Sequence, residues 1–345
     1  MTRSDSAAVL GALLAAFFFG VSTPLSKPLT AHLNAFTLAG LLYLGAGLGL
    51  ALIEPFKARR PAPEGRKFNR RYIAGMVLFG GVLGPVFLML AIKMAPAASV
   101  SIWLNMELVA TALLGALLFK DHLHRLGWAS VAVTVFAGLL LSWGGGAAGF
   151  AAGGLTALAC LSWGFDNHFT ALIDDLSPSQ STLIKGLAAG ATNLLIGLAL
   201  AGGLPPLAAA GKALAVGFVS YGLSITLYIA SAQKLGAVRS QLIFSVSPLF
   251  GVLLSVLLLG EGLSAVQVAS GLLLFGSVLL MLSEKHAHPH LHEAAEHTHE
   301  HSHADLHHDA HHGGERPGPH SHFHVHDKAE HAHPHWPDLH HRHNH

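Results

Sequence analysis

The sequence predicts an all-α integral membrane protein, with ten transmembrane helices arranged as two inverted five-helix repeats and a disordered C-terminal tail. Its composition points to a membrane, because 52% of the 345 residues are hydrophobic, 11% are charged and the mean hydropathy is +0.50. Soluble domains carry roughly 25% charged residues. Several runs of about 20 residues lack Lys, Arg, Asp and Glu, and in a bilayer only helices or closed barrels satisfy the backbone of such runs. A fixed-offset internal match then divides the chain into two halves.

The internal match pairs residues 97–123, AASVSIWLNMELVATALLGALLFKDHL, with residues 237–263, AVRSQLIFSVSPLFGVLLSVLLLGEGL. At an offset of 140 positions, Asp121 aligns with Glu261, and five leucines of the first stretch align with leucines of the second. A self-match of this kind is the signature of a chain built from two copies of one design. Each copy predicts one long apolar helix that ends at an acidic residue. We therefore expect a first repeat at residues 1–144, a second at residues 145–283 and a tail at residues 284–345.

Ten apolar runs predict the spans, at residues 7–29, 35–54, 73–92, 98–118, 126–143, 150–171, 182–202, 212–231, 238–259 and 265–283. The first run is longer than the core of a signal peptide and no convincing cleavage site follows it, so we expect it to be retained as a span. Cys160 is the one cysteine, so it has no partner for a disulfide. It lies within an apolar run, which is typical of a small packing residue.

Basic residues set the expected orientation, because short loops rich in Lys and Arg stay in the cytoplasm. The connection between the second and third spans, residues 54–72, holds seven of them. This predicts a cytoplasmic N-terminus and, after ten spans, a cytoplasmic C-terminus. Five spans per repeat give the two repeats opposite orientations. Inverted repeats with a site at their interface near the midplane are a recurring design of secondary transporters.

Glu107 is the strongest candidate for a functional side chain. It lies near the middle of the fourth predicted span, where a charged group costs about 2.5–3.5 kcal/mol on insertion scales and is a functional candidate by default. Trp103, Glu107 and Thr111 recur every four residues and are therefore expected to share one helix face. We expect Glu107 to bind a substrate or a proton. The alternative is a protonated carboxyl group that is hydrogen-bonded between helices.

Other polar residues predict the walls of a central cavity among spans 1, 4, 6, 8 and 9. Those in spans 6, 8 and 9 are Trp163, Asp166, Asn167, His168, Tyr221, Ser224, Tyr228, Gln241 and Ser245. Asp166 and His168 could equally lie near the cytoplasmic end of their span and reach water, and stripes of Ser, Thr and Tyr also occur as packing contacts between helices. Lys185, near the start of span 7, is expected to extend toward the membrane interface rather than to bind an anion.

The two halves share features with a known family. Each half has an aromatic residue followed by glycine in its first helix, Phe19-Gly20 and Trp163-Gly164, and a long fourth helix that closes in an acidic residue. In this the chain resembles the EamA family of the drug/metabolite transporter superfamily over roughly residues 7–283. The resemblance implies ten spans, cytoplasmic ends, a central cavity between the halves and export of small molecules from bacteria. One departure is that the proline common in the fourth helix of each repeat occurs as Pro248 in the second half, whereas Leu108 takes the aligned position in the first.

The tail from residue 284 onward is hydrophilic, low in complexity and rich in histidine, and we expect no fold there without metal. It holds all but four of the 27 histidines. The candidate metal ligands among them are His286, His288, His290, His292, His297, His299, His301, His303, His320, His322, His324, His326, His340, His341, His343 and His345. Neutral imidazoles with interspersed carboxylates suit zinc, nickel, cobalt or copper and give many interchangeable weak sites. The tail could deliver, sense or buffer metal, or act as a pH-responsive polycation.

Together these observations predict a multi-pass protein of the bacterial inner membrane that is a secondary active transporter and not an enzyme. The expected function is export of a small organic metabolite or amino acid by alternating access, with protons as the coupling ion. The alternatives are a divalent metal exporter fed by the tail and a membrane-tethered metal buffer or sensor. The sequence has no GxxxxGK[ST] phosphate-binding loop, which argues against direct drive by ATP. The expected partners are the lipid bilayer, the transported solute or metal ion and protons; the chain could form a homo-oligomer, no cofactor is required and no nucleic acid is expected.

Overall fold

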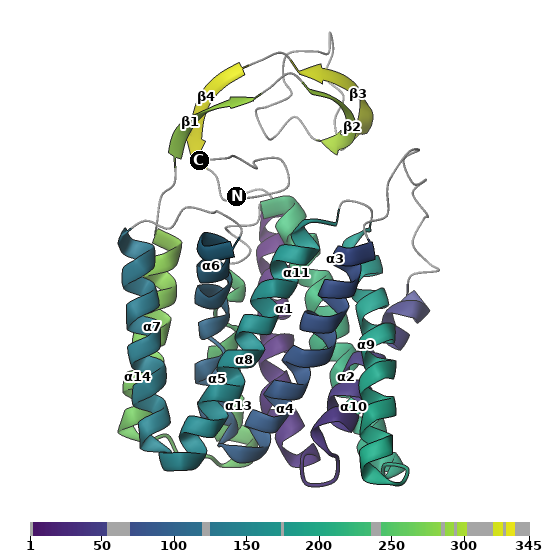
Figure 1. Ribbon diagram of the computed structural model, residues 1–345, viewed down its shortest axis with the longest axis vertical. Coiled ribbons are helices and arrows are strands. Elements are labelled where there is room, and N and C mark those ends of the chain that lie inside the picture. Colours follow the sequence, from purple (N-terminus) through teal and green to yellow (C-terminus); the bar gives the residue numbers. More distant parts are fainter. Residues whose placement is uncertain are drawn as a thin grey trace. The chain divides into compact units, whose positions relative to one another are not determined.

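The computed structural model describes residues 3–53, 70–118, 125–173, 176–235 and 243–283, together with four short strands between residues 287 and 334. The helices up to residue 283 form one unit, in which they lie side by side (Figure 1). Eight helical segments of the described part are long and apolar enough to cross a membrane, and two shorter apolar helices follow them, Ser247–Leu259 and Ala265–Met281. The chain is therefore an almost entirely helical, multi-pass membrane protein, with eight spans assigned by length and composition where ten are predicted.

The helical segments lie close to the predicted spans. In chain order they are α1 (Arg3–Leu29), α2 (Ala35–Ile53), α3 (Arg70–Gly75), η2 (Met76–Leu83), α4 (Gly84–Met94), α5 (Ala97–Trp103), α6 (Met106–Leu118), α7 (Arg125–Gly144), α8 (Gly146–Ala171), α9 (Pro178–Ala201), α10 (Leu207–Gly217), η3 (Phe218–Leu223), α11 (Ser224–Leu235), α13 (Ser247–Leu259) and α14 (Ala265–Ser283). Local sequence sets several of the ends. Ser177 and Gln180 form a capping box at the start of α9, and Gly202 ends that helix in a left-handed conformation.

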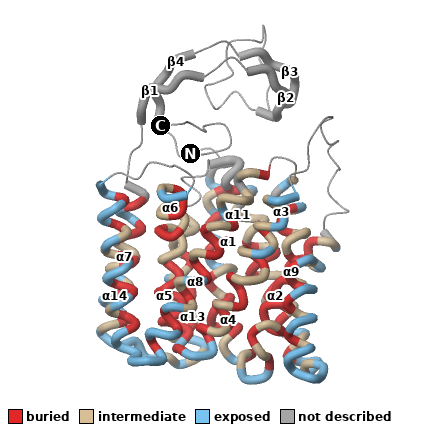
Figure 2. The backbone as a smooth tube through the Cα atoms, viewed as in Figure 1, coloured by how far each residue is buried: buried red, intermediate tan, exposed pale blue. Residues whose placement is uncertain are grey.

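Glycines let the helices approach closely. A Cβ added to Gly186 of α9 would lie 2.7 Å from the backbone nitrogen of Gly47 in α2, and α1 meets α13 in the same way at Gly20 and Gly251. Larger side chains would separate these backbones, as at other small-residue interfaces of membrane helices. Figure 2 shows that buried residues gather where helices face one another. The outward faces are apolar, with leucines such as Leu195 exposed, as expected of surfaces that contact lipid.

The run at residues 97–118 is interrupted, so the expectation of one long helix there is wrong. It forms α5 and α6, separated by a turn at Leu104 and Asn105. The Asn105 side-chain amide donates to the Ile102 carbonyl at 2.9 Å, and local side-chain bonds of this kind compete with the helical pattern. A similar turn at residues 245–246 precedes α13 in the second copy.

Two further apolar runs contain π-helical segments. The segment η2 joins α3 to α4 and includes the pair Gly80 and Gly81, whereas η3 joins α10 to α11 and includes Tyr221. In a π-helix the backbone bonds run from i to i+5, which widens the turn, and such segments occur frequently at functional sites. Both were missed by hydropathy, because a π-helical turn leaves the apolar run intact.

The strands form a separate unit. They are β1 (Ala287–His292), β2 (Ala295–His301), β3 (His320–His326) and β4 (Ala329–Pro334), and β1 pairs with β4 and β2 with β3, both antiparallel. The backbone register sets histidine opposite histidine, for example His299 opposite His322. The side chains of these strands, and residues 302–319 and 335–345, lie outside the described part of the chain. The expectation that the tail has no fold without metal stays a prediction.

Candidate functional site

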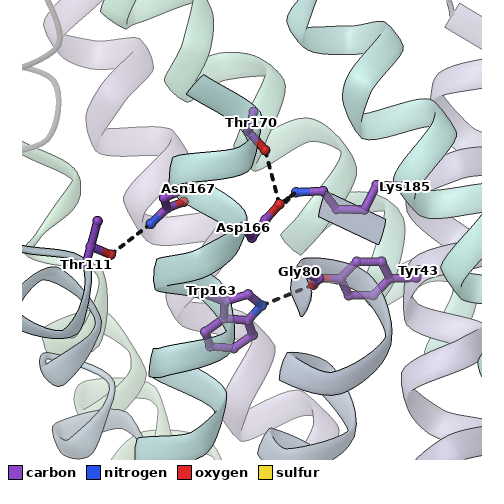
Figure 3. Close-up of polar contacts among 8 residues, drawn as sticks. All are labelled: Tyr43, Gly80, Thr111, Trp163, Asp166, Asn167, Thr170 and Lys185. Atoms are coloured by element: carbon purple, nitrogen blue, oxygen red, sulfur yellow. Dashed lines mark hydrogen bonds and ion pairs between the residues drawn. The ribbon is translucent and has the colours of Figure 1, made fainter. Parts of the chain in front are cut away.

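A buried ion pair joins α8 to α9. The Lys185 ammonium donates to both carboxylate oxygens of Asp166, at 2.7 and 2.5 Å, and the Thr170 hydroxyl donates to the same carboxylate at 3.1 Å (Figure 3). The Lys185 and Asp166 side chains are 14% and 10% exposed. Lys185 therefore does not extend toward the membrane interface as expected, because Asp166, 19 positions earlier in the sequence, offers it a carboxylate inside the helical unit.

The ion pair rests on the π-helical segment η2. A Cβ added to Gly80 would collide with the Asp166 carboxylate, and one added to Gly81 would lie 3.1 Å from Cγ of Lys185. The Gly80 carbonyl accepts two side-chain bonds, from the Tyr43 hydroxyl at 2.7 Å and from the Trp163 indole N–H at 3.2 Å. Glycine is required here because the carboxylate occupies the space of a side chain, and the two bonds fix the open π turn between α2 and α8.

Glu107 lies in the first turn of α6, partly buried, and faces α8. The Asn167 side chain hydrogen-bonds the Glu107 carboxyl group, and the charges of Asp166 and Lys185 also act on it. The Asn167 amide donates to the Thr111 hydroxyl at 3.1 Å, and that hydroxyl donates to the Glu107 carbonyl at 3.0 Å. These contacts bring Glu107, Thr111, Asn167 and Asp166 together from two helices.

His168 also reaches α6. Its Nε2 lies 3.0 Å from the Thr111 carbonyl oxygen. Together with the Asn167 amide, this contact ties α8 to α6 through Thr111.

Aromatic side chains form a second group beside these polar residues. The Tyr221 hydroxyl lies 2.8 Å from the Ser22 hydroxyl, and the Tyr221 ring packs against Phe19 and Tyr43, with centroids 5.8 and 5.3 Å apart. Tyr228 packs against Phe244 at 4.8 Å. Both Tyr221 and Tyr228 interact electrostatically with Glu107. This group joins rings from α1, α2, η3 and α11.

Other predicted site residues lie elsewhere. Trp103 is fully buried, its indole N–H donates to the Gly138 carbonyl of α7 at 3.3 Å, and its ring packs against Gly153 of α8. The Ser224 hydroxyl donates to the Ala15 carbonyl at 2.8 Å, a packing contact between α11 and α1. Ser245 lies in the turn before α13.

The remaining predicted residues fall outside the part that the structure describes. Gln241 and the side chains of the tail histidines belong to this set. Among the residues that are described, no group of three or more His, Cys, Asp and Glu is arranged to bind a metal ion. Sequence reasoning also missed Tyr43 and Gly80, whereas Ser22 was among the polar residues that place span 1 at the predicted cavity. The one available signal was the glycine pair Gly80-Gly81 within an otherwise bulky apolar run.

Comparison with known proteins identifies the family. The sequence profile of the EamA-like transporter family matches residues 6–143 and again residues 152–283. The chain belongs to this family. A protein of Methanothermobacter thermautotrophicus strain Delta H, described as an uncharacterized transporter, is 25% identical over 291 residues, which cover 78% of this chain and 84% of that protein. A solved structure titled "Crystal structure of protein" superposes with a TM-score of 0.54 over 80% of this chain and 96% of its own, at 18% identity, which shows a shared fold.

This family membership, together with the apolar helices, makes the chain a multi-pass membrane transporter rather than an enzyme. Such a protein contacts the lipid bilayer and a small-molecule substrate. The polar and aromatic groups around Glu107 are therefore the candidate site for a transported solute.

Proposed function

We propose that this EamA-like transporter is a secondary active exporter that moves a small organic metabolite or amino acid out of the bacterial cytoplasm by alternating access. The observation that carries the proposal is the pair of interrupted apolar runs. One breaks between α5 and α6 and the other breaks before α13, and the two runs align with each other in the sequence. Discontinuous membrane helices at corresponding positions of two halves form the binding sites of many secondary transporters.

The proposed architecture has ten spans in two inverted repeats. The family profile matches the chain twice, at residues 6–143 and 152–283, which supports two units of similar design. In this arrangement α13 and α14 serve as the ninth and tenth spans, both chain ends lie in the cytoplasm, and the halves alternate in exposing the shared site to either side of the membrane.

Glu107 is the proposed carrier of a proton or of a cationic group of the solute. It begins the second half of an interrupted span, where its hydrogen-bond partner is the neutral Asn167 amide. Rings of Tyr221 and Tyr228 lie within its electrostatic reach. Aromatic faces suit an organic solute, since rings contribute apolar area and attract cations. Metal export is the competing function. Its metal ligands would come mainly from the tail, so it would depend on the tail.

Flux into inside-out proteoliposomes tests the proposal. An imposed pH gradient would drive uptake, measured with labelled amino acids and, separately, with zinc, nickel and cobalt. Four proteins would be compared: the whole chain, a chain ending at Ser283, the variant Glu107→Gln and the control variant Glu284→Gln. We expect an organic solute to accumulate with the whole chain, the truncated chain and the control but not with Glu107→Gln. Metal flux that needs Glu107 and slows without the tail would replace the proposal with metal export. Metal binding by the tail without any flux of solute or metal would favour a buffer or sensor.

A further inference from the structure

In the Asp166–Lys185 pair, gain of one proton by the carboxylate changes both contacts that the ammonium group makes with it. While Asp166 is ionised, Lys185 holds both of its oxygens. Once Asp166 is protonated, it keeps the bond from Thr170 but loses most of its attraction for the ammonium group. Glu107 differs, because its hydrogen-bond partner is a neutral amide and its protonation releases no cation.

Titratable side chains act on Asp166 from three neighbouring helices. Lys185 faces it from α9, while Tyr43 of α2 and Glu107 of α6 interact with it electrostatically. On its own helix, Thr170 donates to it. Lys185 is thus the one cation among the described residues that contact the carboxylate, so the pairing of Asp166 depends on the ionisation of these two groups.

The pair also connects two parts of the chain that are matched separately by the family profile. Asp166 and Lys185 belong to the second matched segment, whereas Gly80 and Gly81, on which they rest, belong to the first. Gly80 leaves the space that the Asp166 carboxylate fills, and Gly81 packs against Ala189 and the stem of Lys185. Rearrangement of the pair therefore changes how η2 packs against α8 and α9.

We propose that Asp166 and Lys185 are the proton-coupling pair of this transporter. A proton arriving from the external side binds the Asp166 carboxylate and releases Lys185, which stays an ammonium ion. The contact on Gly80 and Gly81 loosens and the halves reorient. Loss of the same proton to the cytoplasm re-forms the pair, so one proton crosses per cycle. This inference rests on the proposed export function, with the solute cation at Glu107 and the proton at Asp166.

Hydrogen exchange of η2 tests the inference without any transported solute, with the proton itself as the ligand. The whole chain in lipid nanodiscs would be compared with Asp166→Asn/Lys185→Met and with Glu107→Gln at a series of pH values, after correction for the intrinsic pH dependence of exchange. In the unchanged chain and in Glu107→Gln, exchange at residues 76–83 should become faster as the pH falls. The rate should rise about tenfold per pH unit over the range in which opening is coupled to uptake of one proton. In the double variant it should not depend on pH.

Two results would overturn the proposal. One is exchange at η2 that is independent of pH in the unchanged chain. The other is a pH dependence that survives in Asp166→Asn/Lys185→Met. Because neither measurement needs flux, failure here is separate from failure of the proteoliposome experiment, which tests the export function alone.

Discussion

The Glu261 carboxylate accepts the backbone N–H of Ala97 at 2.8 Å, and its second oxygen accepts that of Ala98 at the same distance. Ala97 begins α5, whereas Glu261 lies between α13 and α14, so the contact joins the two matched segments. Lys27 of α1 donates to the carbonyls of Ile92 and Ala95 at 2.6 and 2.7 Å. The turn from α4 to α5 is therefore held on both sides, at the end of the bundle that is external in the proposed topology.

Glu261→Gln should weaken closure of this end. Hydrogen bonds to charged groups contribute about 1.5–3 kcal/mol each, and loss of one corresponds to at least about a tenfold change in an opening equilibrium. Ser99 is buried and lines a nearby cavity of about 190 Å³. We expect a membrane-impermeant maleimide to label Ser99→Cys from the external side at least about tenfold faster when Glu261→Gln is also present.

The control is Ser99→Cys alone, and Lys27→Met should raise labelling in the same direction because it frees the other side of the turn. Equal labelling rates with and without Glu261→Gln would mean that the carboxylate caps α5 without closing the bundle.

Gly80→Ala should destabilise the helical unit. The added methyl group would collide with the Asp166 carboxylate, which Lys185 and Thr170 hold in place, and overpacking of this kind costs about 1–3 kcal/mol. Gly154 of α8 is the matched control, because a Cβ added there meets no atom within 4 Å. Thermal unfolding in detergent should show a lower midpoint for Gly80→Ala and an equal or higher one for Gly154→Ala. Equal losses for both variants would contradict the close seating of Asp166 on η2.

Single and double neutralisation of the ion pair should be strongly non-additive. Asp166→Asn or Lys185→Met alone leaves one unpaired charge in the helical unit, which costs about 3–5 kcal/mol in buried pairs and less here, because both side chains retain some exposure. The double variant removes both charges and should recover much of that loss. Unfolding by denaturing detergent, run as a double-mutant cycle, measures the coupling. Additive effects would show that the two groups do not stabilise each other.

Hydropathy and charge were sufficient for the helical fold, since an apolar run of about 20 residues has few other structures open to it in a membrane. They located the apolar helices to within a few residues and singled out Glu107, Asp166 and Asn167 as candidate site residues. The interruptions between α5 and α6 and before α13 could not be predicted in this way. Asn105 ends α5 through a bond to a backbone carbonyl three residues away, and the apolar pattern continues across it.

The partner of Asp166 was equally hidden. Lys185 lies near the start of an apolar run, where a lysine usually extends to the interface. The packing of both α8 and α9 against η2 brings its ammonium group to the carboxylate. Tyr43 was passed over for a related reason, because its hydrogen bond depends on a carbonyl that the π-helical turn at Gly80 leaves accessible. Contacts between distant helices and turns of unusual width leave no periodic signal in a single sequence.

Zinc binding by the whole chain should depend on the tail and on pH. Imidazole binds metal in its neutral form, and histidine gains a proton just below neutral pH, so bound zinc should fall steeply between about pH 7.5 and about pH 5.5. Titration calorimetry of the purified protein measures the number of ions bound. A chain ending at Ser283 should bind few ions and keep its thermal midpoint, because the helical unit and the strands are separate units. Equal zinc binding with and without the tail would place the metal sites in the helical unit instead.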